Sequence, residues 1–353
     1  MRIAEIKKEP VWKKIYNTLS LEISKYEFGE NFYTAEDICK KYNVSTITAI
    51  RVLSELEREG LVQKIKKKGT IVKNIKQKID IKLILPEGAL LHKILSNPRS
   101  MEIYSGITSK VEKLGFTFAT IYEKYLLQIF SKFPDHTGFV MLTELSPFIK
   151  GFLKEKKGIP FVLLNPPAYE KNCISIRVDR KKSTYLLVNY FISIGHTRIG
   201  FINGPATSLW FLPRLEGYIQ ALQENGIEYD TALVKETDGD ATSEDEENLE
   251  ELLSLASPPT AIITASDHRA INLLNYCHRK NIKIPDELSI AGDDNSHEGL
   301  LVHPSLTTVE RNMKKIGEKA VECLIMLING KNIPRDIVVQ PELVIRESTK
   351  ERR

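Results

Sequence analysis

Within residues 44–60 the spacing of apolar residues predicts a helix from Ser45 to Arg58, and the outer face of this helix has no core to fill. Four apolar residues repeat at positions that share one side of an α-helix: Ala49, Val52, Leu53 and Leu56. Ser45 precedes them as a cap, because its hydroxyl can accept a hydrogen bond from a first-turn amide, and Gly60 ends the helix. The opposite side carries short polar and β-branched residues. Such a helix suits a major groove of DNA, although taken alone it fits an ordinary surface helix equally well.

Two further helices are predicted before this one. The first begins after Pro10 and repeats apolar residues along one face: Val11, Ile15, Leu19 and Ile23. The segment from Thr34 to Asp37 has the form of a capping box and predicts the start of a short second helix. Residues 42–44 then make a tight turn. Two short helices separated by three or four residues indicate a helix-turn-helix.

Residues 61–73 predict two short strands around a basic tip. The tip holds four consecutive residues: Lys66, Lys67, Lys68 and Gly69. A hairpin after a recognition helix is a wing, whose lysines release counterions from phosphates and gain affinity without reading sequence. A solvated charged turn is the alternative for the lysines alone. Their position beside a helix-turn-helix favours the wing.

From residue 80 onward, strand and helix patterns alternate, which predicts an α/β fold with parallel sheets. Strands are expected at 82–85, 117–121, 138–142, 161–164, 199–202, 232–236, 261–264, 288–291 and 306–309. Helices are expected near 99–114, 146–156, 180–194, 209–225, 243–255, 267–280 and 312–328. This number of units requires two doubly wound sheets.

Composition narrows the class of protein. The 353 residues are 42% apolar and 27% charged, which is typical of globular proteins, and the length suits two or three folding units. The sequence contains no apolar tract long enough to span a membrane and shows no secretory signal. The four cysteines are scattered without a disulfide or metal spacing. We therefore expect reduced thiols and a cytoplasmic location.

Charge is distributed unevenly along the chain. Residues 1–78 hold 17 Lys and Arg against 10 Asp and Glu, whereas the remainder holds 33 against 36. The basic excess of the whole chain therefore lies in its N-terminal fifth. Such asymmetry favours a nucleic-acid or acidic-surface partner for that end of the molecule.

In order and spacing, residues 10–73 resemble the GntR-type winged-helix domain. The resemblance rests on PVWKKIY, the turn FGE, the TAEDI helix start, NVSTIT, and LSELEREGLV followed by KKGT. It implies DNA contacts from Thr34, Ser45, Thr46, Ile47, Thr48, Ile50, Arg51, Lys66, Lys67, Lys68, Gly69 and Thr70. The family usually has arginines where this chain has Glu36, Thr46 and Ile50. With Ile47 and Ile50 outward, we expect contact with thymine methyls and shape readout rather than arginine forks onto guanine.

Polar residues follow several of the predicted strands. In doubly wound sheets ligands bind beyond the carboxyl ends of the strands, which selects Glu87, Thr143, Asn165, Ser266 and Asp294 and their neighbours Gly88, Glu144, Asp267, Asp293 and Asn295. Carboxylates and amides there suit a hydroxyl-rich ligand. For any one of them a helix cap or turn is the alternative, and Asp267 in particular lies where a helix would start.

Five segments of the C-terminal half resemble the sensor domain of the LacI/GalR family. They are GHTRIGFING (195–204), RLEGY (214–218), TAIITASDHRAI (260–271), IPDELSIAGDDN (284–295) and HPSLTTV (303–309). The resemblance implies two periplasmic-binding-protein-like lobes with an effector cleft between them. It further implies that Arg214, Ser266 and Asp294 hold the effector and that Asn165 contacts it from the other lobe. An arginine at position 214 can bridge two sugar hydroxyls or pair with an acidic effector.

These inferences combine into one expected architecture. An α+β winged helix-turn-helix occupies residues 1–73, and a linker occupies 74–79. An α/β two-lobed periplasmic-binding-protein-like domain with two doubly wound parallel sheets occupies 80–348. Its first lobe is expected at about 80–194 plus 311–335, and its second at about 195–310 plus 336–348.

No enzymatic chemistry is expected. The pairs Asp267–His268 and Asp294–His297 have no nucleophile or third group at a recognisable spacing. Histidine and cysteine spacing fits no zinc site, residues 238–249 lack the glycine and glutamate of a calcium loop, and no glycine-rich phosphate loop is present. We therefore predict no catalytic residue, no metal and no cofactor.

The favoured hypothesis is a bacterial transcriptional regulator, of repressor type, that binds operator DNA as a homodimer. A small sugar-like effector bound between the lobes would control its affinity for the operator. The alternative is a cytoplasmic small-molecule-binding protein whose DNA-binding head has degenerated, which the missing arginines would allow.

Overall fold

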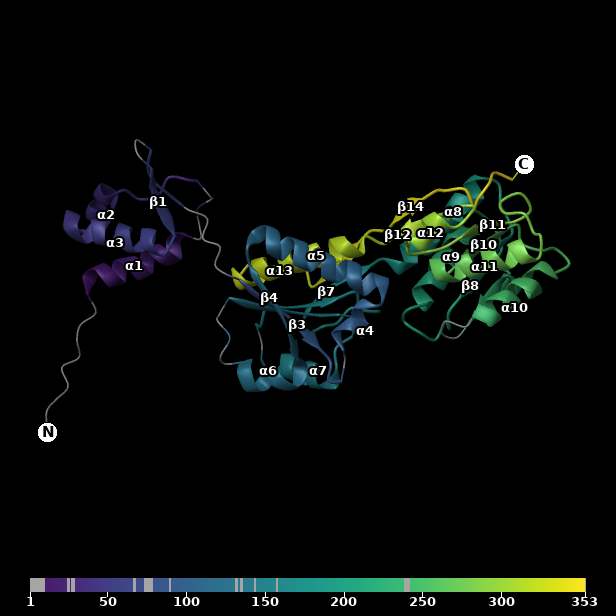
Figure 1. The fold of residues 1–353 in the computed structure, drawn as a ribbon, viewed down its shortest axis with the longest axis horizontal. Coiled ribbons are helices and arrows are strands. Elements are labelled where there is room, and N and C mark those ends of the chain that lie inside the picture. The colour runs from purple at the N-terminus through teal and green to yellow at the C-terminus, as the bar shows by residue number, and fades with distance from the viewer. Residues whose placement is uncertain are drawn as a thin grey trace. The chain divides into compact units, whose positions relative to one another are not determined.

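The computed structural model describes residues 10–23, 26, 29–65, 68–72, 79–88, 90–130, 133, 136–142, 144–156, 158–237 and 242–352. The chain forms two compact units, Met1–Ile79 and Asp80–Arg353 (Figure 1). Some predicted features lie outside the described residues: Phe28 of the FGE turn, Lys66 and Lys67 of the hairpin tip, linker residues 74–78, and Thr143. Among the described residues, no helix is long and apolar enough to cross a membrane, and no cluster of side chains is arranged to hold a metal ion.

Three helices begin the first unit, whose described part we call the head: α1 (Val11–Glu22), α2 (Ala35–Tyr42) and α3 (Thr46–Arg58). The caps form as predicted. Thr34 and Asp37 make both hydrogen bonds of a capping box at the start of α2. The Ser45 side chain accepts a hydrogen bond from the Thr48 amide at the start of α3. Asn43 turns the chain between these two helices with φ 51°, so that α2 and α3 follow each other closely.

An antiparallel hairpin follows the three helices and consists of β1 (Val62–Ile65) and β2 (Gly69–Val72). The segment before α2 lies along β2, because the Phe32 amide donates to the Thr70 carbonyl at 2.8 Å and Asn31 bridges to Ile71. Helices and hairpin share one core, which includes Leu19, Ile38, Leu53, Leu56, Val62 and Val72. The head is therefore a small helical unit with a packed antiparallel hairpin.

The first lobe of the second unit contains a six-stranded sheet in which every pairing is parallel. In spatial order its strands are β13 (Asp336–Val339), β7 (Ile174–Val178), β6 (Phe161–Leu164), β5 (Thr137–Leu142), β3 (Asp80–Leu85) and β4 (Thr117–Tyr122). Helices α5 (Pro98–Leu114) and α13 (Met313–Ile328) cover one face (Figure 1). Helices α6 (Glu123–Ile129) and α7 (Pro147–Glu155) cover the other, and the short α4 (Leu91–Leu95) precedes α5.

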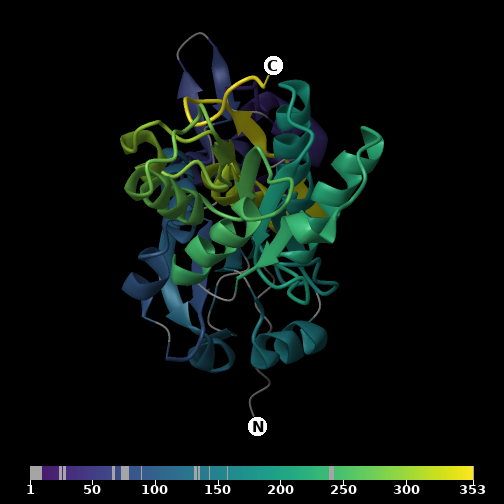
Figure 2. The same cartoon turned by 90° about the vertical axis from the view of Figure 1, so that its right-hand side faces the viewer.

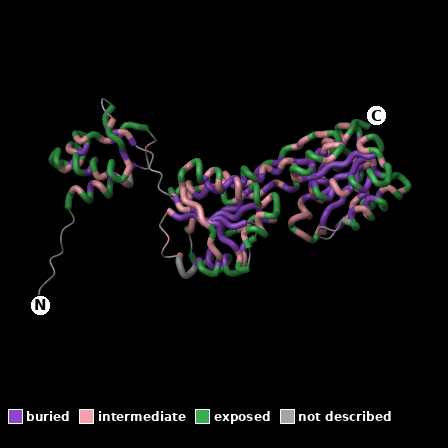
Figure 3. The backbone as a smooth tube through the Cα atoms, in the orientation of Figure 1, coloured by how far each residue is buried: buried purple, intermediate pink, exposed green. Residues whose placement is uncertain are grey.

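The second lobe contains a four-stranded parallel sheet and faces the viewer in Figure 2. Its strands are β11 (Ser289–Ala291), β10 (Ala261–Thr264), β8 (Ile199–Asn203) and β9 (Val234–Glu236), the last preceded by a 3-10 turn at Thr231–Leu233. Alternate residues of β10 face opposite layers: Ile262 packs toward α10 (Thr242–Leu253) and α11 (Asp267–Arg279), and Ile263 toward α8 (Arg180–Ser193) and α9 (Leu212–Glu224). The sheet is therefore buried on both faces, as parallel sheets are (Figure 3).

Three crossings connect the lobes. They lie between β7 and α8, between β12 (Thr308–Glu310) and α13, and between β13 and β14 (Glu342–Val344). β12 and β14 pair antiparallel beside the second sheet, and α12 (Glu298–Leu301) completes that lobe. At the crossings, the Asn312 side chain donates to the Gln340 carbonyl and to the Glu342 carboxylate, both at 3.2 Å. One side chain thereby ties two of the three connections together.

The lobes divide the chain differently from the expected boundaries. Helix α8 was expected in the first lobe, but it packs against α9 in the core of the second. Residues 336–339 were expected in the second lobe, but as β13 they pair with β7 at the edge of the first sheet. The pattern of local residues did not predict β7, β13 or β14. Their positions depend on pairing between segments far apart in the chain, which local periodicity does not report.

Close approach of two helices requires glycine in the first lobe. A Cβ at Gly106 of α5 would clash with the Lys314 carbonyl oxygen of α13, and a Cβ at Gly317 of α13 would clash with the Ile103 carbonyl oxygen of α5. The two glycines therefore allow the backbones to touch. This contact fixes α5, whose first turn borders the cavity between the lobes.

Candidate effector cleft and DNA-binding face

A cavity of about 310 Å³ lies between the two lobes of the second unit. The first lobe contributes polar residues at the start of α5 and after β6: Asn97, Arg99, Ser100 and Asn165. The second contributes an aromatic pair and several arginines, among them Trp210, Phe211, Arg180, Arg214 and Arg311, together with Ser266. A cavity of this size is at the small end of ligand sites and suits a single sugar-sized molecule.

The predicted effector residues are distributed unequally around this cavity. Asn165, Arg214 and Ser266 line it. Asp294 stands beside it, where its carboxylate contacts Arg311 at 2.6 Å. Glu87 does not line it; its side chain is largely exposed and lies 3.7 Å from the ammonium of Lys124, so the expected effector contact of Glu87 does not fit the structure. Thr143 lies outside the described residues.

Asp293 is the centre of a buried ionic cluster at the cavity wall. Its carboxylate accepts from Arg311 Nε at 2.7 Å and from Arg214 Nε at 3.2 Å. All three side chains are at most 3% exposed. Burial acts against the charge of Asp293, but the two guanidinium groups outweigh it and hold the pKa of that carboxyl below its usual range. The cluster presents Arg214 to the cavity in a fixed orientation.

The pKa values of the two arginines in this cluster shift in opposite directions. Burial and the neighbouring Arg311 lower the pKa of Arg214 to about 10, while Asp293 offsets part of this effect. Arg311 is equally buried, but Asp293 and Asp294 more than compensate and raise its pKa. Arg214 also donates to the carbonyl of Trp210, which ties the aromatic wall to the same cluster.

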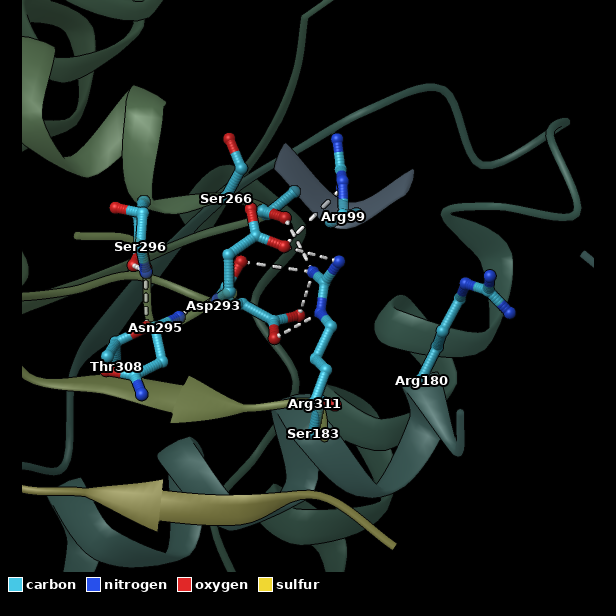
Figure 4. Close-up of polar contacts among 12 residues, drawn as sticks. Arg99, Arg180, Ser183, Ser266, Asp293, Asn295, Ser296, Thr308 and Arg311 are labelled. Atoms are coloured by element: carbon cyan, nitrogen blue, oxygen red, sulfur yellow. Dashed lines mark hydrogen bonds and ion pairs between the residues drawn. The ribbon is translucent and has the colours of Figure 1, made fainter. Parts of the chain in front are cut away.

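Arg180 links the lobes from the first residue of α8. It donates to the Pro166 carbonyl at 3.1 Å and to the Asn165 side-chain oxygen at 2.7 Å, and its guanidinium lies 4.4 Å from the Trp210 ring centroid. The side chain is 4% exposed. Burial, followed by repulsion from Arg214 and Arg311, lowers its pKa well below the ordinary arginine value. In Figure 4 it stands apart from the carboxylates that surround Arg311.

Ser266 has a structural partner as well as a place on the cavity wall. It is the cap of α11, and its side chain accepts from the Arg269 amide at 3.5 Å. Asp267 is therefore not the cap; it is the first residue of the helix, fully buried, and accepts from the Ser296 amide at 2.6 Å and from the Thr308 hydroxyl. The first turn of α11 thus borders the cavity.

In the head, the outer face of α3 presents apolar side chains to solvent. Ile47 is 81% and Ile50 45% exposed, and Thr46 is exposed beside them. Arg51 is exposed too, with its guanidinium 4.3 Å from the Trp12 ring centroid. The back of the helix is buried at Ala49, Val52, Leu53 and Leu56, as the apolar stripe predicts.

The other described residues that were predicted to contact DNA through polar side chains are hydrogen-bonded within the head or buried, apart from those at the hairpin tip. Thr34 and Ser45 act as caps, and the hydroxyl of Thr48 lies 3.0 Å from that of Ser45. Thr70 is only 5% exposed, because in β2 its side chain points into the head, so a DNA contact from this side chain is wrong. Lys68 and Gly69 are exposed at the hairpin.

Sequence reasoning missed several residues of the cleft: Arg99, Arg180, Trp210, Phe211 and Arg311. Asn97 followed by Pro98 is a signal for the start of a helix, and Asn97 caps α5, so this part of the cleft could have been found from the sequence. Arg180 and Arg311 lie at lobe crossings, and no local pattern marks a crossing. They are recognisable only once the sheets are assembled.

The chain is similar to a known ligand-binding domain family and, over most of its length, to transcriptional repressors. A family model of the periplasmic binding protein-like domain matches residues 188–349. The chain is 29% identical over 343 residues to the HTH-type transcriptional repressor CytR of Escherichia coli (strain K12), covering 91% of this chain and 97% of that one. It is 27% identical over 341 residues to the arabinose metabolism transcriptional repressor of Geobacillus stearothermophilus, covering 91% and 92%.

Solved structures agree on the fold. The lac repressor dimer bound to operator and the anti-inducer ONPF superposes with a TM-score of 0.63 at 19% identity, covering 78% of this chain and 95% of that one. At this identity the similarity supports the two-lobed architecture. The similarity to the two repressors, in contrast, extends over almost the whole chain.

Proposed function

We propose that the chain is a DNA-binding transcriptional repressor like those of the LacI/GalR type, and that a small sugar-like effector in the cleft sets its operator affinity. The observation that carries this proposal is the cavity itself. Both lobes build its walls, and Arg214, which lines the cavity, is held there by Asp293. A ligand that touches both lobes stabilises one arrangement of them over others, which is the requirement for coupling to a distant site.

The crossings give this coupling a physical route within the second unit. Asn312 ties two connections together, and Arg180, close beyond the third, bonds to the first lobe. A change of lobe angle must alter these contacts. Coupling of about 1–3 kcal/mol, roughly 5–150-fold in DNA affinity, is ordinary for such regulators.

The head is proposed to be a GntR-type winged helix that reads DNA through α3. Its support is the order of elements: three helices, an antiparallel hairpin, and a strand-like segment before α2 that pairs with β2. Thr46, Ile47 and Ile50 are the proposed base-facing residues, and Arg51, Lys66, Lys67, Lys68 and Gly69 the proposed backbone contacts. Thr34, Ser45 and Thr48 would contribute at the helix starts.

The proposed active form is a homodimer on a two-fold operator. The lac repressor, which shares the two-lobed fold, is a dimer bound to operator in its crystal structure, and two heads per assembly would read two half-sites. Sedimentation of the full chain with a selected operator duplex measures this directly. One chain per half-site in a two-to-one complex is expected.

The direct test is selection of duplexes from a random-sequence pool, followed by gel shift with the full chain at moderate salt. We expect a two-fold symmetric sequence to be enriched and shifted. If no sequence is enriched, the repressor does not act through this head.

A degenerate head is the competing proposal. The observation that favours it is the exposed Glu36 at the start of α2, because GntR-type domains usually have an arginine at this position. The salt dependence of binding to random duplex DNA separates the two. A head with several phosphate contacts gives a steep dependence, and a degenerate head gives almost none.

A further inference from the structure

The charged side chains that line the cavity are all arginines. Five line it, Arg99, Arg180, Arg214, Arg269 and Arg311, and among the described residues no aspartate or glutamate lines it with them. Arg269 is paired behind the wall with Asp245 at 2.6 Å. Arg99, Arg214 and Arg311 share two carboxylates, those of Asp293 and Asp294. The wall therefore has more positive than negative charge.

Arg180 is the residue left without a carboxylate. Its hydrogen-bond partners are neutral oxygens of Asn165 and Pro166, and of the described residues no carboxylate lies within ion-pair distance. A buried cation without a counter-charge is costly, because neutral dipoles replace its hydration only in part. The ring of Trp210 offers a further, weaker compensation.

Two helices add to the positive potential. The first turns of α5, 17 residues long, and α11, 13 residues long, border the cavity through Asn97, Ser100 and Ser266. Amide groups in the first turn of a helix carry partial positive charge, and the effect is strongest for a ligand near that turn. The helices come from different lobes, so the positive potentials of their first turns add together only in the cavity between the lobes.

These observations deepen the effector cleft proposed above and rest on it. We propose that the effector carries an anionic group, a phosphate or a carboxylate on a sugar-sized molecule, and that Arg180 binds this group between the lobes. A carboxylate or phosphate would supply the charge that the wall lacks and can accept two parallel N–H bonds from a guanidinium. The polyol part would then lie toward Trp210 and Arg214.

The alternative is that Arg180 only holds the lobes together through Asn165 and Pro166. In that case the protein would bind neutral and anionic sugars without preference. Ligand charge therefore separates the two possibilities without any substitution.

The first experiment compares matched ligands on the full chain by thermal shift and calorimetry. The pairs are glucose with glucose 6-phosphate, ribose with ribose 5-phosphate, and glucose with gluconate; inorganic phosphate is a further probe, and sodium chloride at equal ionic strength is the control. In at least one pair we expect the anion to bind about tenfold or more tightly than its neutral partner. If no anion, inorganic phosphate included, stabilises the protein beyond the chloride control, the inference is wrong.

The second experiment places the anion at Arg180. In Arg180→Gln the preference for the anionic member of the pair should fall about tenfold or more, and in Arg180→Lys it should be partly retained, because the charge remains but the fork is lost. Lys181→Gln removes one exposed positive charge from the next residue of α8 and should leave the preference unchanged. An equal loss in Lys181→Gln and Arg180→Gln would overturn the assignment to Arg180.

The two proposals fail in different ways. If neutral sugars bind and release operator DNA while anions do not, the regulator stands and the anionic effector is wrong. If anions bind by calorimetry but operator DNA is never bound, the inference about the cleft holds and the proposed function does not.

Discussion

Arg99 of α5 and Asp294 after β11 form an ion pair between the lobes, with Nη1 of the arginine 3.5 Å from Oδ1 of the aspartate. This ion pair joins the first lobe to the second. Asp294 is also held by Arg311 at 2.6 Å, so its position is fixed and Arg99 is the partner that can leave. The pair therefore links the closure of the cleft to the first turn of α5.

Arg99→Gln should weaken effector binding without destabilising the fold. The Arg99 side chain is 42% exposed, and a pair of this kind contributes at most about 1 kcal/mol, which corresponds to roughly fivefold in affinity. Calorimetry of effector binding and thermal unfolding measure the two quantities. Lys110→Gln, which removes a pair with Glu322 inside the first lobe, is the matched control and should leave affinity unchanged. Equal losses in both variants would contradict a role of Arg99 in closure.

Arg214→Lys should weaken the effector response and leave operator binding intact. Lysine keeps a charge near Asp293 but loses the fork that donates both to Asp293 and to the Trp210 carbonyl. We expect the effector concentration that releases operator DNA to rise about tenfold or more, measured by gel shift. Arg198→Lys, at an ion pair with Asp230 away from the cavity, is the control. A normal response in Arg214→Lys would show that the cleft assignment is wrong.

The buried carboxyl of Asp267 should make stability depend on pH. Burial, and then the charge of Asp294, raise its pKa from 3.8 to about 6. The folded state therefore binds the proton more tightly than the unfolded state, and the stability that this contributes is lost as pH rises from about 4 through about 6. Asp267→Asn, which stays neutral, should gain up to roughly 3 kcal/mol relative to the wild type between pH 4 and pH 7.5. Urea unfolding at the two pH values measures the difference, and a difference that does not change with pH would refute the shifted pKa.

Ile47→Ser should lower affinity for the selected operator but not for random DNA. Ile47 is 81% exposed, so its loss costs the fold little, whereas lost contact with a thymine methyl would reduce specific affinity by about 1 kcal/mol or more. Val11→Ser, at an exposed apolar position of α1, is the control. Operator selection yielding a core anchored by guanines would contradict apolar readout by Ile47.

Lys67→Ala combined with Lys68→Ala should weaken binding to all duplexes alike. Each lysine lost from a phosphate contact reduces the slope of log affinity against log salt by about 1, so a reduction of about 2 is expected. Lys154→Ala with Lys156→Ala changes the net charge equally from exposed positions at the end of α7. If both double variants lose affinity equally, the effect is one of net charge and the hairpin is not a wing.

Local sequence was sufficient wherever neighbouring residues decide the structure. The cap at Ser45, the capping box at Thr34 and the buried stripe of α3 all formed as predicted, because each depends on residues within one or two helical turns. Alternating strand and helix patterns likewise predicted both parallel sheets. The likeness to known sensor motifs placed Arg214, Ser266 and Asn165 at the cavity, where they lie.

Tertiary structure decided what depends on long-range pairing. Thr70 is polar and follows a basic tip, yet its position in β2 turns it into the core of the head. β13 joins the first sheet through β7, and α8 belongs to the second lobe. Each lobe is therefore built from segments that are separated in the sequence. This arrangement brings Arg180 and Arg311 from two separate crossings to one cavity wall with Arg214. The sequence by itself predicted a regulator with a DNA-binding head and a two-lobed sensor. The excess of positive charge in the cleft arises only on folding, because it depends on distances between side chains that the assembled lobes define.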